Sequence, residues 1–215
     1  RLDPKLAKRK VVTGIPIRAE VRAVRDAPYP FAPTGGELNI LITAGSQGAR
    51  LFGDVVPEAV KLLPEELRAR LVLSQQVRME QAQLVRELYQ SIGVKCDVRP
   101  FFDDMPERLK AAHLVICRGG GSSITECAIA GRPAIIVPLA IATDDHQTAN
   151  ADALVSVGAA DVLRETEFDP VTLAALLQKR LASGHELSVR AAAARAVGKP
   201  DAAKALADLG EKLAI

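Results

Sequence analysis

Short apolar runs alternate with helix-length segments along most of this chain, and this alternation sets the fold class. Five segments have the length of a strand: residues 39–43, 71–73, 94–98, 114–117 and 134–137. Helical patterns separate them, and the one at residues 78–92 ends at Gly93, as helices commonly do. Strands that alternate with helices predict a doubly wound α/β fold with a mainly parallel, Rossmann-like sheet.

The two ends of the chain differ from this pattern. Residues 1–35 are basic and contain several prolines, so we expect an irregular connecting segment that adds nothing to the core. Residues 161–163 are a candidate sixth strand. Beyond them, Asp169-Pro170 is typical of a capped helix start, and Ala/Leu-rich helix with two breaks continues to the end of the chain.

Composition supports a large buried sheet and argues against several classes of function. The 215 residues are 48% hydrophobic but only 3% aromatic, so Leu, Val, Ile and Ala must form the core, as around buried parallel strands. A formal net charge of +2 and few aromatic residues argue against a nucleic-acid partner. No apolar run is long enough to cross a bilayer. The three cysteines are not spaced like a metal site, so we expect free thiols and no bound metal.

The strongest functional signal is a glycine-rich loop between a predicted strand and a predicted helix. The apolar run 114–117 stops at Arg118, and three glycines, two serines, Ile, Thr and Glu126 follow. Glycines leave the backbone amides open to a ligand, and a helix starting near Ser123 adds unpaired N–H groups and a partial positive charge. Such a loop favours an anion, above all phosphate. We expect it to hold the diphosphate of a nucleotide.

Two side chains of this loop have alternative roles. Glu126 is suited to accept hydrogen bonds from two ribose hydroxyls, but Ser123 and Glu126 also match a helix capping box, and the two roles are compatible. Arg118 is suited to contact a base or a phosphate, although the residue taken alone is more typical of a surface charge at the end of a strand. The spacing alone leaves these alternatives open.

Two further polar loops follow predicted strands. Residues 45–48 read G-x-x-G, which lacks the dinucleotide-binding fingerprint and suits either a second phosphate contact or a tight turn. Residues 143–150 include His146, Gln147 and Asn150, whose polar groups suit the hydroxyls of a sugar; an aspartate cap followed by solvated residues is the alternative. Because ligands bind such sheets at the carboxyl ends of strands, the three loops predict one cleft.

Five motifs occur in a fixed order along the chain, at residues 14–18 (GIPIR), 45–50 (GSQGAR), 100–105 (PFFDDM), 117–126 and 145–150 (DHQTAN). Together they make the chain similar to the MurG family, the bacterial peptidoglycan N-acetylglucosaminyltransferases, over nearly its whole length. The resemblance implies the carboxy-terminal half of a two-domain GT-B enzyme. It implies an interdomain linker at residues 1–35, a UDP-sugar donor-binding Rossmann-like domain at 36–198, and a helix at 199–215 that crosses back to the amino-terminal domain.

The resemblance also implies the donor, UDP-N-acetylglucosamine, and the residues around it. Phe102 contacts uracil largely through its backbone with Arg118 nearby, and Glu126 holds the ribose. The residues around the diphosphate are Arg18, Ser46, Gly121, Ser122 and Ser123. Those that read the sugar hydroxyls are His146 and Gln147, with Asn150 close by. Many family members have glutamine where His146 stands, so hydrogen bonding at this position depends here on the tautomer or on pH.

The implied reaction transfers N-acetylglucosamine from UDP-N-acetylglucosamine to lipid I and makes lipid II for the cell wall, with inversion at the anomeric carbon. It needs no cofactor and no obligatory protein-bound metal. The resemblance places the enzyme peripherally at the cytoplasmic face of the inner membrane. It assigns the acceptor, the membrane contact and the general base to the amino-terminal domain, and no residue of this chain matches that base. We therefore expect this chain alone to bind donor without transferring sugar.

Three other functions stay open at this point. The chain is compatible with half of a UDP-sugar 2-epimerase, with a free-standing donor subunit of a two-component N-acetylglucosaminyltransferase, and with a non-catalytic module that binds nucleotide sugars. The epimerases use acidic residues from both of their domains, whereas this sequence has no clear carboxylate cluster beyond Glu126.

Overall fold

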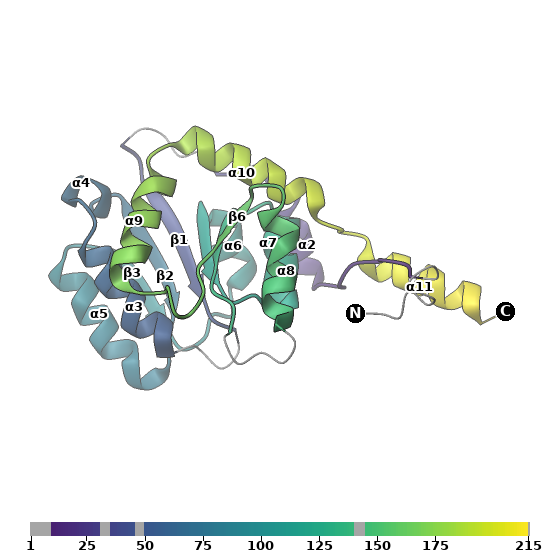
Figure 1. The fold of residues 1–215 in the computed structure, drawn as a ribbon, viewed down its shortest axis with the longest axis horizontal. Coiled ribbons are helices and arrows are strands. Elements are labelled where there is room, and N and C mark those ends of the chain that lie inside the picture. The colour runs from purple at the N-terminus through teal and green to yellow at the C-terminus, as the bar shows by residue number, and fades with distance from the viewer. Residues whose placement is uncertain (1–9, 31–34, 46–49, 140–144, 215) are drawn as a thin grey trace.

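The computed structural model describes residues 10–30, 35–45, 50–139 and 145–214, which form a sheet with helices on both faces (Figure 1). The strands are β1 (Leu38–Thr43), β2 (Leu71–Gln76), β3 (Lys95–Arg99), β4 (Leu114–Cys117), β5 (Ala134–Ile136) and β6 (Ala160–Val162). They lie in the order β3-β2-β1-β4-β5-β6, and all neighbours are parallel. The predicted doubly wound, Rossmann-like fold is confirmed, including its sixth strand.

The strand order reverses between β1 and β4, which pair from Ile40 opposite Leu114 to Thr43 opposite Cys117. Crossovers leave β1 towards β2 on one side, whereas β4 continues towards β5 on the other. The connections therefore diverge at the carboxyl ends of these two strands. Ligands of doubly wound sheets bind at such a switch point.

Alternation along β1 divides the core into two layers. Ile40 and Ile42 face one layer, which is covered by α3 (Arg50–Lys61), α5 (Ala82–Ser91) and α9 (Pro170–Leu181). Leu41 faces the other layer, which is covered by α2 (Ala19–Val24), α6 (Met105–Ala111), α7 (Gly121–Ala130), α8 (His146–Val155) and part of α10 (Gly184–Val197). The remaining short elements are α4 (Glu65–Arg68) and η1 (Met79–Gln81). Both sheet faces are buried, so the strands read as apolar runs.

One buried arginine fixes the ends of two helices in the second layer. Arg132 is only 1% exposed, and its guanidinium donates to the carbonyls of Leu109 and Lys110 in α6 and of Ala130 and Gly131 at the end of α7. Terminal carbonyls of a helix lack partners within the helix, so these bonds satisfy them. Burial lowers the pKa of Arg132 to about 10. Arg132 thus anchors the end of α7 opposite to the glycine loop.

Two local predictions were wrong. Residues 19–24, expected to be irregular, form α2, whose Val21 and Val24 are buried in the core because α2 packs against α6 and α7. Helix α7, expected to start near Ser123, starts at Gly121. The loop before it is therefore shorter than the sequence suggested, and the role of residues 1–35 as an interdomain linker stays a prediction.

The last helix, α11 (Ala202–Leu213), extends away from the sheet domain together with the start of the described chain (Figure 1). The Lys199 ammonium donates to the carbonyl of Val12 across 2.8 Å, which joins the two segments where α11 begins. Leu206 and Leu213 of α11 are 50% and 78% exposed. The predicted crossing of this helix to another domain stays a prediction.

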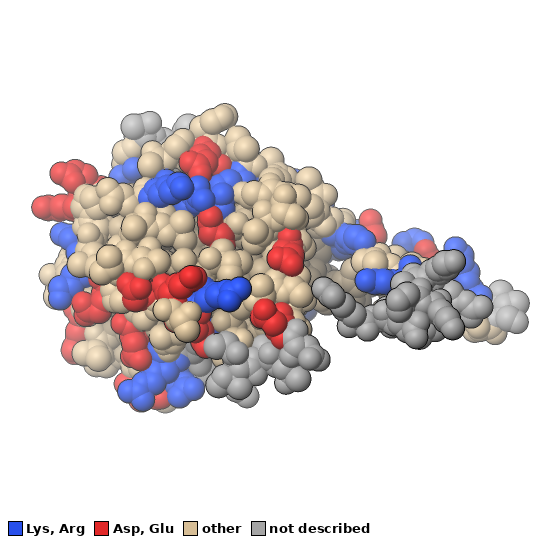
Figure 2. All heavy atoms as spheres, viewed as in Figure 1, with Lys and Arg blue, Asp and Glu red and all other residues tan. Residues whose placement is uncertain are grey.

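Charges are well mixed on the face of the molecule shown in Figure 2, where basic and acidic side chains are interspersed. Among the described residues, no helix combines the length and the apolar character needed to span a membrane.

Candidate functional site

The glycine loop joins the end of β4 to the first turn of α7. Gly120 is the N-cap residue, with φ −64° and ψ 140°, and no side chain caps the helix within the described part of the chain. The amides of the first turn, from Gly121 to Ser123, are therefore open to an anion. Ser122 is exposed and Ser123 half-buried. This arrangement fits the predicted diphosphate cradle.

Helix α8 holds this loop from the side. The Gly119 N–H donates to Gln147 Oε1 at 3.1 Å, and the Gly119 carbonyl accepts from Asn150 Nδ2 at 3.0 Å. A Cβ on Gly119 would lie 2.4 Å from the Gln147 backbone oxygen, so only glycine fits here. Gly121 is nearby, since a Cβ there would lie 3.9 Å from Asn150 Nδ2 and 2.9 Å from Ile15 Cδ1. The glycine loop thus lies against Gln147 and Asn150, two of the predicted sugar residues.

Glu126 does not cap the helix. Because α7 starts at Gly121, Ser123 lies inside the helix and cannot be the N-cap of a capping box, so that alternative was wrong. The Glu126 side chain is 24% exposed and lies 3.8 Å from the guanidinium of Arg18. Burial raises the pKa of Glu126 above its ordinary value, and Arg18 opposes this shift. A half-buried carboxylate without a capping role is suited to bind hydroxyl groups.

Arg118 is not the surface charge that one alternative proposed. Its side chain is 12% exposed, forms a 2.6 Å ion pair with Glu165, and donates to the carbonyl of Val137 at 3.1 Å. Its guanidinium also lies 5.1 Å from the ring centre of Phe52. These contacts tie the end of β4 to the segments that follow β5 and β6. A role for Arg118 beside a base or phosphate stays a prediction.

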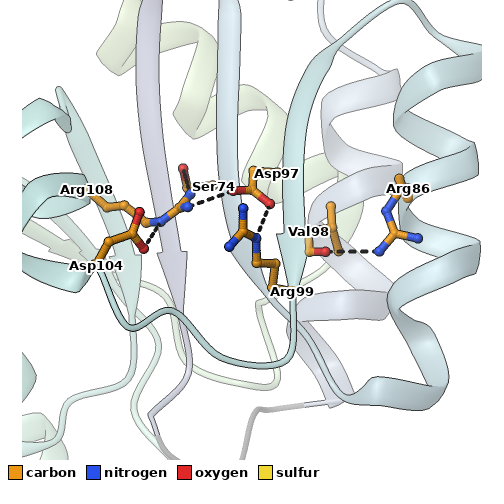
Figure 3. A network of polar contacts seen from close by, with 7 residues as sticks. All are labelled: Ser74, Arg86, Asp97, Val98, Arg99, Asp104 and Arg108. Carbon is orange, nitrogen blue, oxygen red and sulfur yellow. Dashed lines mark hydrogen bonds and ion pairs between the residues drawn. The ribbon is translucent and has the colours of Figure 1, made fainter.

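A charged network holds the loop between β3 and α6 (Figure 3). Arg108 donates to Asp104 at 2.7 Å, to Asp97 at 2.6 Å and to Ser74 Oγ at 2.9 Å. Its guanidinium lies 3.7 Å from the centre of the Phe102 ring. Asp104 is the N-cap residue of α6, but its side chain makes no cap and binds Arg108 instead.

Phe102, the predicted uracil contact, is 1% exposed, so its side chain is inaccessible and only its backbone can meet a ligand. The adjacent Phe101 is 66% exposed, which is unusual for a large aromatic ring. Sequence reasoning passed over Phe101 because two neighbouring phenylalanines give no sign of which one is buried. The contacts described for Phe102 link it to Arg108 and do not link it to the glycine loop.

The structure gives less information about two predicted site residues, Ser46 and His146. Ser46 lies outside the described residues. His146 is exposed on the first turn of α8. The alternative function of this segment was an aspartate that caps α8. Asp145 is the N-cap residue, with φ 49°, but its side chain makes no cap, so the alternative was wrong for Asp145. Asp144 lies outside the described residues. Within the described part of the chain, no three or more His, Cys, Asp or Glu side chains are grouped so that they could hold a metal ion.

Residues 39–206 match the glycosyltransferase family 28 C-terminal domain. The chain belongs to this family. It is 49% identical over 207 residues to the UDP-N-acetylglucosamine--N-acetylmuramyl-(pentapeptide) pyrophosphoryl-undecaprenol N-acetylglucosamine transferase of Maricaulis maris (strain MCS10), covering 96% of this chain and 56% of that protein. The enzyme of the same name from Rhodospirillum centenum (strain ATCC 51521 / SW) is 50% identical over 200 residues, which cover 93% and 53%.

A solved structure agrees with these sequence matches. The crystal structure of Acinetobacter baumannii MurG superposes on this family 28 domain with a TM-score of 0.75 and 34% sequence identity, covering 89% of this chain and 53% of that one. The resemblance to MurG that the five motifs predicted is thereby confirmed. The chain spans about half the length of the relatives it matches.

Proposed function

We propose that this family 28 domain binds UDP-N-acetylglucosamine as the donor half of an inverting transferase that converts lipid I to lipid II in peptidoglycan synthesis. The observation that carries the proposal is the uncapped N-terminus of α7, whose amides lie beside the polar first turn of α8 and the half-buried Glu126. Family membership and the names of the similar enzymes support the choice of donor.

Each part of the donor has a matching group. The diphosphate binds the α7 amides with Ser46, Ser122 and Ser123 around it, and the partial positive charge of the helix stabilises UDP as it leaves. Glu126 accepts hydrogen bonds from the ribose, and Arg18 turns from Glu126 towards a phosphate. His146, Gln147 and Asn150 lie at the sugar. The backbone at Phe102 meets uracil, with Arg118 on the nucleoside side.

The rest of the reaction requires groups beyond this chain. We assign the general base, the lipid I site and the peripheral contact with the cytoplasmic face of the inner membrane to an amino-terminal domain, because no group described here is placed to activate an acceptor hydroxyl. Mixing this chain with such a domain and assaying transfer to lipid I tests the assignment. If the mixture never transfers sugar, the donor-half proposal fails in favour of a binding module.

Donor binding is tested by calorimetry with UDP, UDP-N-acetylglucosamine and ADP. We expect both uridine nucleotides to bind, and ADP to bind at least tenfold more weakly. Equal affinity for UDP and ADP would argue against the proposal. The epimerase alternative makes a separate prediction, since only an epimerase would convert UDP-N-acetylglucosamine to its 2-epimer, which NMR detects directly.

A further inference from the structure

Two residues near the start of α8 hold the glycine loop at a single residue, Gly119. Both backbone polar groups of Gly119 are bound by α8: its N–H by Gln147 and its carbonyl by Asn150. These residues are three apart, so they lie on one face of the helix. The Gln147 Oε1 atom also accepts from the Leu139 N–H at 3.0 Å. One side chain thus ties the loop after β4 to the loop after β5.

These contacts fix which way each amide side chain points. Gln147 faces two N–H donors, so the atom between them must be its oxygen, and Asn150 faces a carbonyl, so the atom there must be its nitrogen. A carbonyl oxygen has two lone pairs, and both of those on Gln147 are used. Gln147 therefore keeps only its amino group for a ligand, whereas Asn150 keeps its oxygen and one N–H.

We propose that Gln147 and Asn150 are positioning residues that hold the backbone of Gly119 and thereby fix the geometry of the adjacent diphosphate cradle. This inference rests on the proposed donor site and adds a role that sugar recognition does not include. A residue that only reads the sugar cannot affect a ligand that lacks one. A residue that holds the cradle affects UDP and UDP-N-acetylglucosamine alike.

Gln147→Met removes both polar atoms at nearly constant length and tests this role by calorimetry. We expect about tenfold weaker binding of UDP, because Gln147 accepts two hydrogen bonds that together are worth about that factor. UDP-N-acetylglucosamine should lose at least as much affinity, since its sugar is also proposed to meet Gln147. Gln178→Met, the same change at an exposed position of α9, is the matched control and should leave both affinities unchanged. If Gln147→Met weakens only the sugar nucleotide, the inference is overturned.

A second measurement needs no ligand. Amide hydrogen exchange by NMR should show faster exchange at Gly119 and Leu139 in Gln147→Met, and wild-type exchange in Gln147→Glu, whose carboxylate still accepts from both N–H groups. Faster exchange in Gln147→Glu would overturn the inference even if the methionine variant fails to fold. Should the wild type bind neither nucleotide, the proposed function fails, and exchange still decides whether the loop is held as described.

Discussion

The two loops that we propose as the ends of the donor site are held by different kinds of interaction. At the glycine loop, the contacts of Gly119 with Gln147 and Asn150 are hydrogen bonds between neutral groups. At the loop between β3 and α6, Arg108 binds the carboxylates of Asp97 and Asp104. The glycine loop is therefore held by close packing and neutral hydrogen bonds, whereas the loop between β3 and α6 is held by balanced charges.

This difference follows from what each end has to present. A cradle for a diphosphate works through open backbone amides, and a carboxylate bracing them would repel the ligand. The neutral amide side chains of Gln147 and Asn150 brace the loop without that repulsion. The uracil proposed for the other end carries no charge, so ion pairs can hold that loop, provided that each carboxylate is balanced.

Gly119→Ala should disrupt the glycine end most severely. The new Cβ would lie 2.4 Å from a backbone oxygen of α8, which cannot move without shifting the helix. Overpacking of this kind costs roughly 1–3 kcal/mol, and we expect UDP and ADP binding to be lost together. Denaturant unfolding and calorimetry measure the two effects.

Gly210→Ala is the control for this change. Nothing lies within 4 Å of a Cβ at Gly210 in α11, so alanine should stabilise that helix by roughly 0.5–1 kcal/mol. If Gly119→Ala is as stable as the wild type and still binds UDP, close fit does not define the glycine end.

Arg108→Met should disturb the base end while sparing the cradle. The guanidinium loses three side-chain hydrogen bonds and its contact with the Phe102 ring, and we expect about 2 kcal/mol lower stability. The preference for UDP over ADP should fall, because the loop carrying Phe102 loosens. Calorimetry with both nucleotides measures this.

Arg22→Met provides the comparison for this variant. Arg22 and its partner Asp201 are both largely exposed, so removing that pair should change stability by less than about 0.5 kcal/mol. If Arg108→Met prefers UDP over ADP as strongly as the wild type does, the charged network does not contribute to recognition of the base.

The sequence predicted the framework, and the proximity of the glycine loop to the start of α8, better than it predicted individual contacts. Strand and helix patterns identify all six strands, because burial on both sheet faces makes them apolar runs. Residues 19–24 were missed, since α2 is short and is stabilised by packing against α6 and α7 and not by its own pattern. Arg118 was misjudged as a possible surface charge because its partner, Glu165, is distant in sequence. The hydrogen bonds of Gln147 and Asn150 to Gly119 could not be predicted, because sequence spacing does not show which loop these side chains face.

Glu126→Gln separates ligand binding from stability at the glycine end. Glutamine keeps the shape but loses the charge, so we expect about tenfold weaker UDP binding, the size of one charge-assisted hydrogen bond. Because burial raises the pKa of Glu126, the folded state favours the protonated form. Its stability contribution is complete below the ordinary glutamate pKa and is lost as pH rises, so glutamine should raise Tm at pH 7.

The same substitution has a built-in test at low pH. The gain in Tm should vanish as pH falls below about 4.5, where glutamic acid is neutral in the unfolded chain as well. A variant that is less stable at pH 7 and binds UDP normally would instead support a purely structural Glu126.

The smallest expected effect is a difference in acid sensitivity between the two ends. Burial tends to raise the pKa of Asp97, but hydrogen bonds from Arg99 and Arg108 outweigh it and lower that pKa; the Arg108 hydrogen bond lowers the pKa of Asp104. Their contribution to stability is therefore present above the ordinary aspartate pKa of about 3.8 and is lost as pH falls through the lowered values.

Denaturant unfolding of the wild type and two variants between pH 7 and pH 2.5 detects this difference. The stability gap between wild type and Arg108→Met should stay constant down to about pH 4 and then shrink, because protonated carboxyls no longer need the guanidinium. The gap between wild type and Gln147→Met should stay constant throughout, since the hydrogen bonds at Gly119 join neutral groups. Parallel curves for the two variants would mean that charge compensation does not distinguish the base end from the glycine end.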